Sequence, residues 1–528
     1  MILSTHGRME VKMNPLILTF DLGTQSMRGM LVNKQGQIVY MIQHKYETPY
    51  YSKKPGWAEQ KPEFYFDTLC SISKELKGKS PSGFDDVIGV TLTAIRDSSV
   101  CLDENNEPLR DVILWLDSRE TNHVKPFKWW IRTAMKLVGM EATLNKQYKV
   151  SAANWIMENE PDIWEKTHKF VMLPTYLNFK MTGQLKDCPA NMIGHIPFDY
   201  KKMSWQSKNN IKRCMCDIPK LQLCDLVQTE ETIGMITNQM EELSGIPQGL
   251  PLIATGSDKG CETLGLSVIN EEKAALSFGT TATVQFATKK YFEPKRFLPA
   301  YPGVPRGMYN PEIEIFRGYW LISWFKREFA MKECVEAGRR GCDPEKILNE
   351  RLREIPPGCD GLILQPFWTP GVVTPNAKGA IIGFSDVHTR IHIYRAIIEG
   401  IGFALMDGMY SMERRSGQKI KEIYVAGGGS QSDEICQITA NMFGLPVVRI
   451  QTHEASGLGA SIAGFVAMGE FKSYEEAISQ MVHIKDVFQP DMEEHIIYEK
   501  LYHYVYKRIY SRLLPLYVKI KHLTKREV

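Results

Sequence analysis

Apolar residues along this chain fall into short runs that end at glycine, threonine and aspartate, a pattern typical of β-strands followed by turns. The first run, at residues 16–20, leads into the sequence DLGTQS at residues 21–26, and a second run covers residues 29–32. Short apolar runs separated by turn residues predict a hairpin. Residues 87–93 and 112–115 are predicted as further strands, whereas residues 120–250 have a mainly helical pattern broken by prolines.

The same pattern returns near residue 251. An apolar run at residues 251–255 leads into Gly256-Ser257-Asp258, and another at residues 273–278 leads into Gly279-Thr280-Thr281 before the apolar residues 282–287. Two Gly-Thr turns in matching contexts, about 255 residues apart, indicate a duplicated domain. We therefore expect the boundary between the two copies at residues 255–265.

A third turn of interest follows the apolar residues 424–426. Three glycines, Gly427, Gly428 and Gly429, stand there before an amphipathic stretch at residues 434–443. A strand, a glycine turn and a helix N-terminus can cradle a phosphate or a nucleotide, because free backbone N–H groups point outward. A tight strand-to-helix turn without a ligand fits the same residues. The Walker pattern and a well-placed Rossmann glycine motif are both absent from the sequence.

Residues 495–528 form a helical, tyrosine-rich segment with a basic end. An amphipathic basic helix can lie on a membrane surface. We favour instead a terminal helix that packs on the body of the protein with its basic face in water.

Composition narrows the class of protein. The 528 residues correspond to about three domains, or two large ones, at roughly 150 residues each. Hydrophobic residues make up 43% and charged residues 24%, as in soluble globular proteins. The net charge of +3 lacks the basic bias of a nucleic-acid binder.

Membrane and export signals are not apparent in the sequence. There is no run of about 18 apolar residues that would span a membrane, and the first fourteen residues lack the apolar stretch of a secretory signal. Eleven cysteines are scattered without a Cys-x-x-Cys pair. We expect reduced thiols in a cytoplasmic protein and no metal site built from cysteine.

Taken together, these motifs resemble those of the FGGY carbohydrate kinases, within the sugar-kinase, actin and Hsp70 ATPase superfamily. The resemblance covers residues 16–490 and follows the family's order of motifs. These are FDLGTQSMRGMLV (20–32), PGWAEQ (55–60), IGVTLTAIRDSS (88–99), VILWLDSR (112–119), ATGSDKGCETLG (254–265), SFGTTATV (277–284) and AGGGSQSD (426–433).

The most specific stretch is residues 379–399, in which Gly379, Gly383, His392 and Glu399 fit the family's C-terminal signature with its spacing intact. The family's other signature, a lysine-rich segment before a tryptophan, fits poorly. Its equivalent at residues 148–155 has no lysine three residues before the tryptophan. That departure bears on the identity of the substrate rather than on the chemistry.

The resemblance implies an α/β fold of two duplicated actin-like (ribonuclease H-like) ATPase domains that flank a cleft. We expect an N-terminal extension at residues 1–14 and a sugar-binding domain at residues 15–258. An ATP-binding domain is expected at residues 259–494, and a C-terminal helical extension at residues 495–528.

The resemblance also implies the roles of individual residues. Asp258 would be the general base that takes the proton of the acceptor hydroxyl, although an aspartate at a helix start is also a favoured N-cap. Asp21 would hold Mg²⁺, often through water, and Arg28 would supply charge or form a salt bridge. The residues expected to bind ATP and its phosphates are Gly23, Thr24, Gln25, Ser26, Gly279, Thr280, Thr281, Gly427, Gly428, Gly429, Ser432 and Asp433.

For the acceptor, Arg96 and Asp97 align with the polar pair that contacts substrate hydroxyls in glycerol kinase-like members, and a surface ion pair is the alternative. Trp115 would line the pocket or belong to the core. Lys259 replaces the glutamine or asparagine common in the family. It would contact an acidic or phosphorylated acceptor or pair with Glu262, and we favour the pairing.

The sequence thus predicts an ATP- and Mg²⁺-dependent kinase of a small-molecule sugar or polyol. A ketopentose such as xylulose is the placeholder acceptor, and glycerol, another polyol or a modified signal sugar remain open. A non-catalytic sugar sensor and an actin- or Hsp70-like ATPase are alternatives. Intact Asp21 and Asp258 oppose the first, and the signature at residues 379–399 opposes the second. No nucleic-acid or membrane partner is expected, and a homodimer is a family-level expectation.

Overall fold

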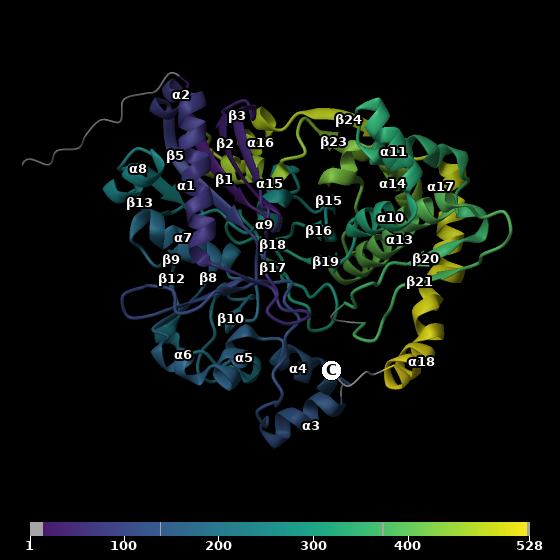
Figure 1. Cartoon of the computed structure of the whole chain (residues 1–528), viewed down its shortest axis with the longest axis horizontal. Helices are drawn as coiled ribbons and strands as arrows, with labels where there is room; N and C mark the ends of the chain where they lie inside the picture. The colour runs from purple at the N-terminus through teal and green to yellow at the C-terminus, as the bar shows by residue number, and fades with distance from the viewer. Residues whose placement is uncertain (1–13, 138, 372–373, 525–528) are drawn as a thin grey trace, which may run out of the picture.

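Two six-stranded mixed sheets lie side by side in the computed structural model, which describes residues 14–137, 139–371 and 374–524 (Figure 1). The expected N-terminal extension lies outside these residues except for Asn14. In spatial order the first sheet contains β13 (Thr232–Met235), β14 (Pro251–Ile253), β5 (Val87–Ala94), β1 (Leu16–Leu22), β2 (Ser26–Asn33) and β3 (Ile38–Lys45). The second contains β19 (Glu312–Ile315), β16 (Ala282–Phe286), β15 (Lys273–Phe278), β22 (Glu422–Ala426), β23 (Val447–Ile450) and β24 (Ile484–Phe488).

Both sheets have the same pairing sense. In the first, β1, β2 and β3 are antiparallel, β1, β5 and β14 are parallel, and β13 closes the edge antiparallel. In the second, β15, β16 and β19 repeat the antiparallel unit, β22 and β23 the parallel unit, and β24 the edge. The duplication predicted from the two Gly-Thr turns is therefore confirmed.

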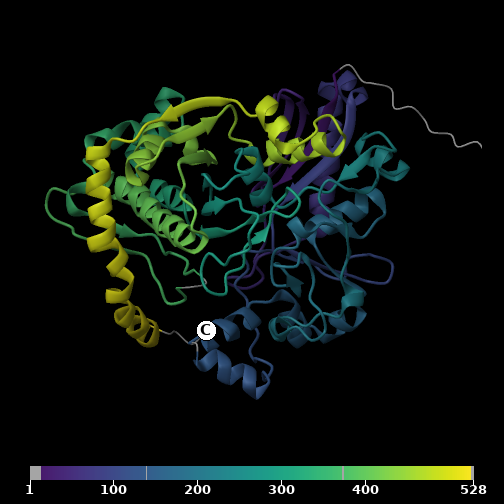
Figure 2. The ribbon, with the colours of Figure 1, turned by 180° about the vertical axis from the view of Figure 1, so that it is seen from behind.

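Each sheet is covered by helices, which explains why β1 is buried along its whole length. On one face of the first sheet, α1 (Pro62–Lys79) packs against Gly29 through Ile72 and Leu76. The other face is covered by α15 (Ala455–Ala467), a helix from the far end of the chain (Figure 2). We call the first sheet with its covering helices the first lobe, and the second sheet with its helices the second lobe.

The lobes are joined through two helices that cross in close contact. Side chains of α9 (Asp258–Gly265) contact β15 and β16 of the second sheet, while α15 lies on the first sheet. A Cβ at Gly459 of α15 would overlap the carbonyl oxygen of Cys261, and one at Gly265 would overlap that of Ala455. Only glycine permits this approach of two backbones.

The region at residues 120–250 is more broken than its pattern predicts, with short helices separated by irregular chain. Its helices are α3 (Trp129–Leu137), α4 (Glu141–Lys149), α5 (Ala152–Asn159), α6 (Pro161–Lys166), α7 (Leu173–Thr182) and α8 (Asn238–Ser244). Two of them, α6 and α7, have a proline within their first two positions, as proline's fixed φ allows. The strand expected at residues 112–115 is confined to β7 (Val112–Ile113).

Other short elements complete the first lobe and its border. They are α2 (Pro81–Asp85), β4 (Glu59–Gln60), β6 (Ser99–Leu102), β8 (Lys169–Met172), β9 (Lys186–Asp187), β10 (Phe198–Asp199), β11 (Ser204–Trp205) and β12 (Asp225–Leu226). The second lobe adds β17 (Tyr301–Pro302), β18 (Tyr309–Asn310), β20 (Ile363–Gln365), β21 (Ala380–Ile382), α10 (Trp320–Phe329), α11 (Met331–Arg340), α12 (Pro344–Glu350), α13 (Arg390–Ser416) and α14 (Asp433–Phe443). Helix α16 (Tyr474–Met481) packs beside the first sheet (Figure 1).

The C-terminal segment is helical, as expected, and packs on the second lobe. It consists of α17 (Met492–Leu501), one π-helical turn at residues 502–506 and α18 (Lys507–Leu523), and it runs along the outer edge of the molecule (Figure 2). Tyr498, Tyr502 and Tyr506 are buried in the core of the second lobe. Within the described residues, no helix combines the length and the apolar character needed to cross a membrane.

The signature stretch at residues 379–399 builds the second lobe. Thr389 and His392 form a capping box at the start of α13. One turn further, Arg395 donates to Glu399 at 2.8 Å in a buried pair, and Tyr498 also donates to that carboxylate at 2.8 Å. These residues therefore secure the start of α13 and its contact with the C-terminal segment.

Candidate functional site

The carboxyl ends of three neighbouring parallel strands bring the expected phosphate loop, acceptor pair and base together. Asp21 lies at the end of β1, Arg96 and Asp97 follow β5, and Asp258 follows β14. Ligands of open α/β sheets bind outside the carboxyl ends of parallel strands. The sheet order thus assembles residues that are up to 237 positions apart in the chain.

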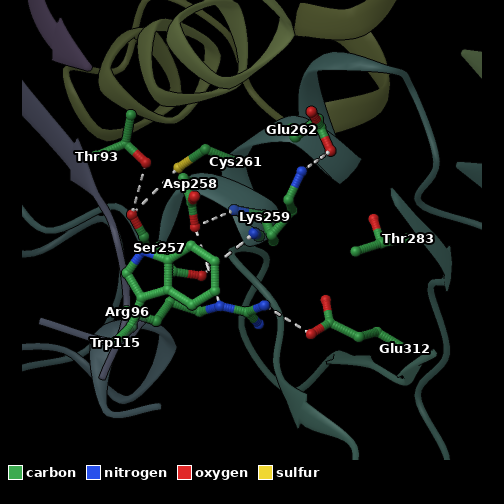
Figure 3. A network of polar contacts seen from close by, with 12 residues as sticks. Thr93, Arg96, Trp115, Ser257, Asp258, Lys259, Cys261, Glu262, Thr283 and Glu312 are labelled. Atoms are coloured by element: carbon green, nitrogen blue, oxygen red, sulfur yellow. Dashed lines mark hydrogen bonds and ion pairs between the residues drawn. The ribbon is translucent and has the colours of Figure 1, made fainter. Parts of the chain in front are cut away.

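Asp258 is the first residue of α9 but not its cap. The N-cap is Ser257, whose hydroxyl accepts from the Gly260 N–H at 3.3 Å. One carboxylate oxygen of Asp258 accepts from the Lys259 N–H at 2.8 Å, and 27% of the side chain remains exposed (Figure 3). The capping alternative is therefore wrong, and the carboxylate keeps an oxygen free to accept a proton.

Asp21 is buried beside few compensating charges. Its nearest cation, Arg28, is 3.9 Å away and forms a closer ion pair with Glu454 at 2.9 Å. Burial raises the pKa of Asp21 to about 7; Arg28 opposes this shift, and the carboxylates of Glu454, Asp258 and Glu262 add to it. A carboxylate in this state gains most from a cation placed next to it.

Asp21 fits a Mg²⁺ ion that is shared with a phosphate. Within the described residues no hydrogen bond to its carboxylate is present, and no group of three acidic, histidine or cysteine side chains could hold a metal by itself. Mg²⁺ commonly takes one or two carboxylates and completes its shell with waters and substrate phosphates. A single buried carboxylate beside the loop that is expected to bind phosphate matches that donor set.

The loop at residues 23–26, which was expected to bind phosphate, is a tight hairpin turn that is hydrogen-bonded to Trp115. The Gly23 N–H donates to the Ser26 carbonyl at 2.9 Å, which closes the turn between β1 and β2. The Trp115 indole N–H donates to the Thr24 hydroxyl at 2.9 Å. Trp115 is half-buried and packs against the core of the first lobe, so it is not a fully buried core residue. Gln25 is exposed in the same turn.

Arg96 reaches across to the second lobe. Its Nη2 lies 2.7 Å from Glu312 of β19, and its guanidinium is also 3.9 Å from Glu314 and 4.0 Å from Asp258. Burial disfavours the charged guanidinium, but the neighbouring carboxylates outweigh burial and raise the pKa of Arg96 further. The surface ion-pair alternative is wrong, because Arg96 is largely buried and does not pair with Asp97.

Asp97 pairs with a residue that the motifs do not indicate. Its two oxygens contact the Nδ1 of His195 at 2.7 Å and the His195 backbone N–H at 2.9 Å. The Nε2 of His195 lies 3.1 Å from the Gln147 side-chain oxygen. Burial disfavours the charged form of both groups, but the attraction between Asp97 and His195 outweighs the effect of burial. The pKa of Asp97 is therefore lowered and that of His195 is raised.

Lys259 pairs within α9, as favoured from the sequence. Its Nζ lies 3.0 Å from Glu262 and donates to the Ser277 hydroxyl of β15 at 2.7 Å. Ser277 in turn donates to Glu262 at 3.0 Å. These three contacts link α9 to the second sheet. They also neutralise the ammonium of Lys259 within the protein.

The two glycine loops of the second lobe follow adjacent parallel strands. Gly279, Thr280 and Thr281 come after β15, and Gly427 comes after β22. Gly427 has φ +84°, and a Cβ there would press on the backbone of Phe278 and Gly279. A Cβ at Gly429 would meet the Tyr319 ring, whereas one at Gly428 would meet open space. Packing thus requires two of the three glycines, and Gly428 leaves room for a ligand.

Ser432 and Asp433 have partners inside the chain. The Ser432 hydroxyl caps α14 by accepting from the Ile435 N–H at 3.3 Å. Asp433 forms an ion pair with Arg449 at 2.7 Å and stays largely exposed. Both side chains therefore secure the start of α14 directly after the glycine turn.

Four residues that contact Arg96, Asp97 or His195 were missed from the sequence: Gln147, His195, Glu312 and Glu314. Glu312 and Glu314 alternate with isoleucines in β19, a period-two signal that was available to sequence reasoning. Figure 3 shows Glu312 extending toward Arg96, with Thr283 of β16 nearby. His195 and Gln147 carry no such signal, because each lies in a segment without a distinctive pattern.

Comparisons with known proteins extend over nearly the whole chain. The model of the N-terminal domain of the FGGY family of carbohydrate kinases matches residues 16–265, and that of the C-terminal domain matches residues 274–468. A xylulose kinase of Lactococcus lactis is 27% identical over 504 residues, covering 94% of this chain and 96% of the relative. A gluconokinase of Bacillus licheniformis is 23% identical over 521 residues, covering 98% and 97%.

Solved structures share the fold. A ligand-bound xylulose kinase from Lactobacillus acidophilus superposes with a TM-score of 0.80 at 23% identity, covering 96% of this chain and 99% of that chain. A Plasmodium falciparum glycerol kinase with ADP gives a TM-score of 0.74 at 18% identity, covering 94% and 98%.

Proposed function

The chain belongs to the FGGY family of carbohydrate kinases, and we propose that it transfers the γ-phosphoryl group of ATP to one hydroxyl of a sugar or polyol, with Asp258 as the general base. One observation carries this assignment. Asp258 lies at the start of α9, where its side chain is not used to cap the helix. It is partly exposed and lies 4.0 Å from the guanidinium of Arg96. A carboxylate so placed can take a proton from a hydroxyl held by its neighbours.

The proposed reaction is an in-line displacement at phosphorus. The acceptor oxygen forms a bond to the γ-phosphorus, the bond between that phosphorus and the β,γ-bridging oxygen breaks, and ADP leaves. The acceptor proton passes to Asp258, and the product is a phosphate monoester. Phosphoryl transfer depends mainly on positioning and charge stabilisation, so most of the remaining residues bind and orient.

Both lobes contribute to nucleotide binding in this proposal. The second lobe holds ATP at the turns after β15 and β22, where Gly428 leaves space, and the backbone N–H groups of residues 279–281 face the phosphates. The hairpin at residues 23–26 faces the transferring group from the first lobe. Asp21 would hold Mg²⁺, which supplies positive charge to the phosphate oxygens when bound.

The acceptor lies on the first lobe in this account. Arg96 and the Asp97–His195 pair donate to and accept from its hydroxyls, and the indole of Trp115 borders the space. A ketopentose such as xylulose is the proposed acceptor, supported by the resemblance to relatives named xylulose kinase. The proposed setting is the cytoplasm, with a homodimer as the family-level expectation.

Acceptor-dependent ADP release tests the proposal. Purified protein with Mg·ATP is assayed against ketopentoses, aldoses, polyols and sugar acids, with ADP measured by a coupled enzyme. We expect strong stimulation by one class of acceptor. ADP release that is independent of any acceptor would indicate an actin- or Hsp70-like ATPase, and acceptor binding without ADP release would indicate a sensor.

A further inference from the structure

The wall that the second lobe presents to the base is acidic. Strand β19 has the sequence EIEI, so Glu312 and Glu314 share one face while Ile313 and Ile315 enter the core of the second lobe. Both glutamates approach Arg96, at 2.7 Å and 3.9 Å. Both glutamates and Asp258 therefore face the same guanidinium, that of Arg96.

The positive charges near this wall are already neutralised. The side chain of Arg96 is 12% exposed and faces three carboxylates, those of Glu312, Glu314 and Asp258. The ammonium of Lys259 is used by Glu262 and Ser277. No cation in this set is left to bind a carboxylate of a ligand.

A polyhydroxy ligand, by contrast, finds both donors and acceptors there. Arg96 retains N–H groups beyond the one that meets Glu312. Burial raises the pKa of Glu314 to about 7, with Glu312 adding to the shift and Arg96 opposing it. Glu314 can therefore accept from a hydroxyl when ionised and donate to one when protonated.

We propose that Glu312 and Glu314 select uncharged polyhydroxy acceptors, ketoses and polyols, and reject sugar acids. This inference rests on the proposed function, because it names the acceptor class of the same site. An aldonate carboxylate would lose its hydration beside the charge of Glu312 and the partly ionised Glu314, and a like charge at an interface is a common means of excluding a ligand. The sequence allowed Lys259 to contact an acidic acceptor, and this proposal disfavours such an acceptor.

Size-matched pairs of ligands test the inference. Glycerol and glycerate, xylitol and xylonate, and glucitol and gluconate each differ by one terminal carboxylate. Isothermal calorimetry without nucleotide gives Kd for each, and coupled ADP release gives kcat/KM. We expect every polyol that binds to bind more tightly than its acid, by roughly ten- to hundredfold, as expected for unit charges a few ångströms apart near a protein surface.

Charge-removing variants locate the cause. Glu314→Gln loses no hydrogen bond present in the structure. It should reduce the preference for a polyol over its acid, measured as the ratio of their Kd values, by roughly tenfold. The double variant Glu312→Gln/Glu314→Gln should reduce this preference further. Glu422→Gln is the matched control. It removes the same charge at the first residue of β22, the end of that strand opposite Gly427, and should leave the ratio of Kd values unchanged.

The outcomes separate this inference from the proposed function. Tighter binding of any acid than of its polyol, or a ratio unchanged in the double variant, would overturn the inference even if the protein is an active kinase. Selective polyol binding that is lost in the double variant but accompanied by no ADP release would support the inference and refute the kinase proposal.

Discussion

Asp21 and Asp258 lack the close cationic partner that Asp97 and Glu262 have. Asp97 is paired with His195, and Glu262 with Lys259. Among the described residues, the nearest guanidinium lies 4.0 Å from Asp258 and 3.9 Å from Asp21. Carboxylates left without a close partner in a site are candidates for chemistry rather than for stability.

The hydrogen bond from Trp115 to Thr24 predicts coupling between the acceptor side and the first phosphate loop. Trp115→Phe and Thr24→Val should each lower kcat about fivefold, the effect of losing a hydrogen bond of about 1 kcal/mol. Because both variants remove the same bond, the double variant should cost no more than either alone. Additive losses in the cycle would show that the two residues act separately.

The Asp97–His195 pair predicts a pH-dependent contribution to stability. The pKa of His195 is raised above its ordinary value of 6.5, so the contribution is fully present below that value and is lost as pH rises through the higher folded-state pKa. The pKa of Asp97 is lowered, so Asp97 stays ionised across this range. His195→Gln should therefore lower Tm more at about pH 6 than at about pH 9.

The control for that measurement is His123→Gln. His123 contacts Glu158 on the surface and is largely exposed, and exposed pairs contribute little to stability. A difference in Tm between wild type and His195→Gln that is the same at both pH values would contradict the ion-pair account.

At the scale of elements, the crossing of α9 and α15 predicts a strong dependence on glycine. Gly459→Ala would force a methyl group against the Cys261 carbonyl and should destabilise the protein by about 1–3 kcal/mol, as overpacking does. Gly338→Ala in α11 has open space around it and should instead add about 0.5–1 kcal/mol. Chemical denaturation measures both; equal effects of the two substitutions would argue against a packed crossing.

The strands that end in turns were predictable because their signal is local. The apolar runs before residues 21, 258 and 279 became β1, β14 and β15. The packing of α15 on the first sheet was not predictable, because it depends on contacts such as that of Thr19 with Ser461, which are 442 residues apart in the chain. The same holds for His195, whose partner Asp97 is 98 residues away.

At the scale of the whole molecule, the sequence repeat predicted the duplicated architecture, and the shared strand order of the two sheets confirms it. The residues between the lobes were harder to predict. Glu312 and Glu314 approach Arg96 only because the joined lobes bring β19 next to the end of β5. Contacts between residues of different lobes have no characteristic sequence spacing, so the sequence alone does not predict them.

The measurement that tests the account most directly is the amount of phosphorylated acceptor formed per ADP, determined by mass spectrometry for wild type, Asp258→Asn and the exposed control Asp225→Asn. We predict one phosphate ester per ADP in wild type and in the control. Asp258→Asn should form it roughly 10²- to 10⁴-fold more slowly, the usual range for loss of a general base, with ATP binding retained. Ester formation at the wild-type rate in Asp258→Asn, or free phosphate in place of the ester, would contradict the account.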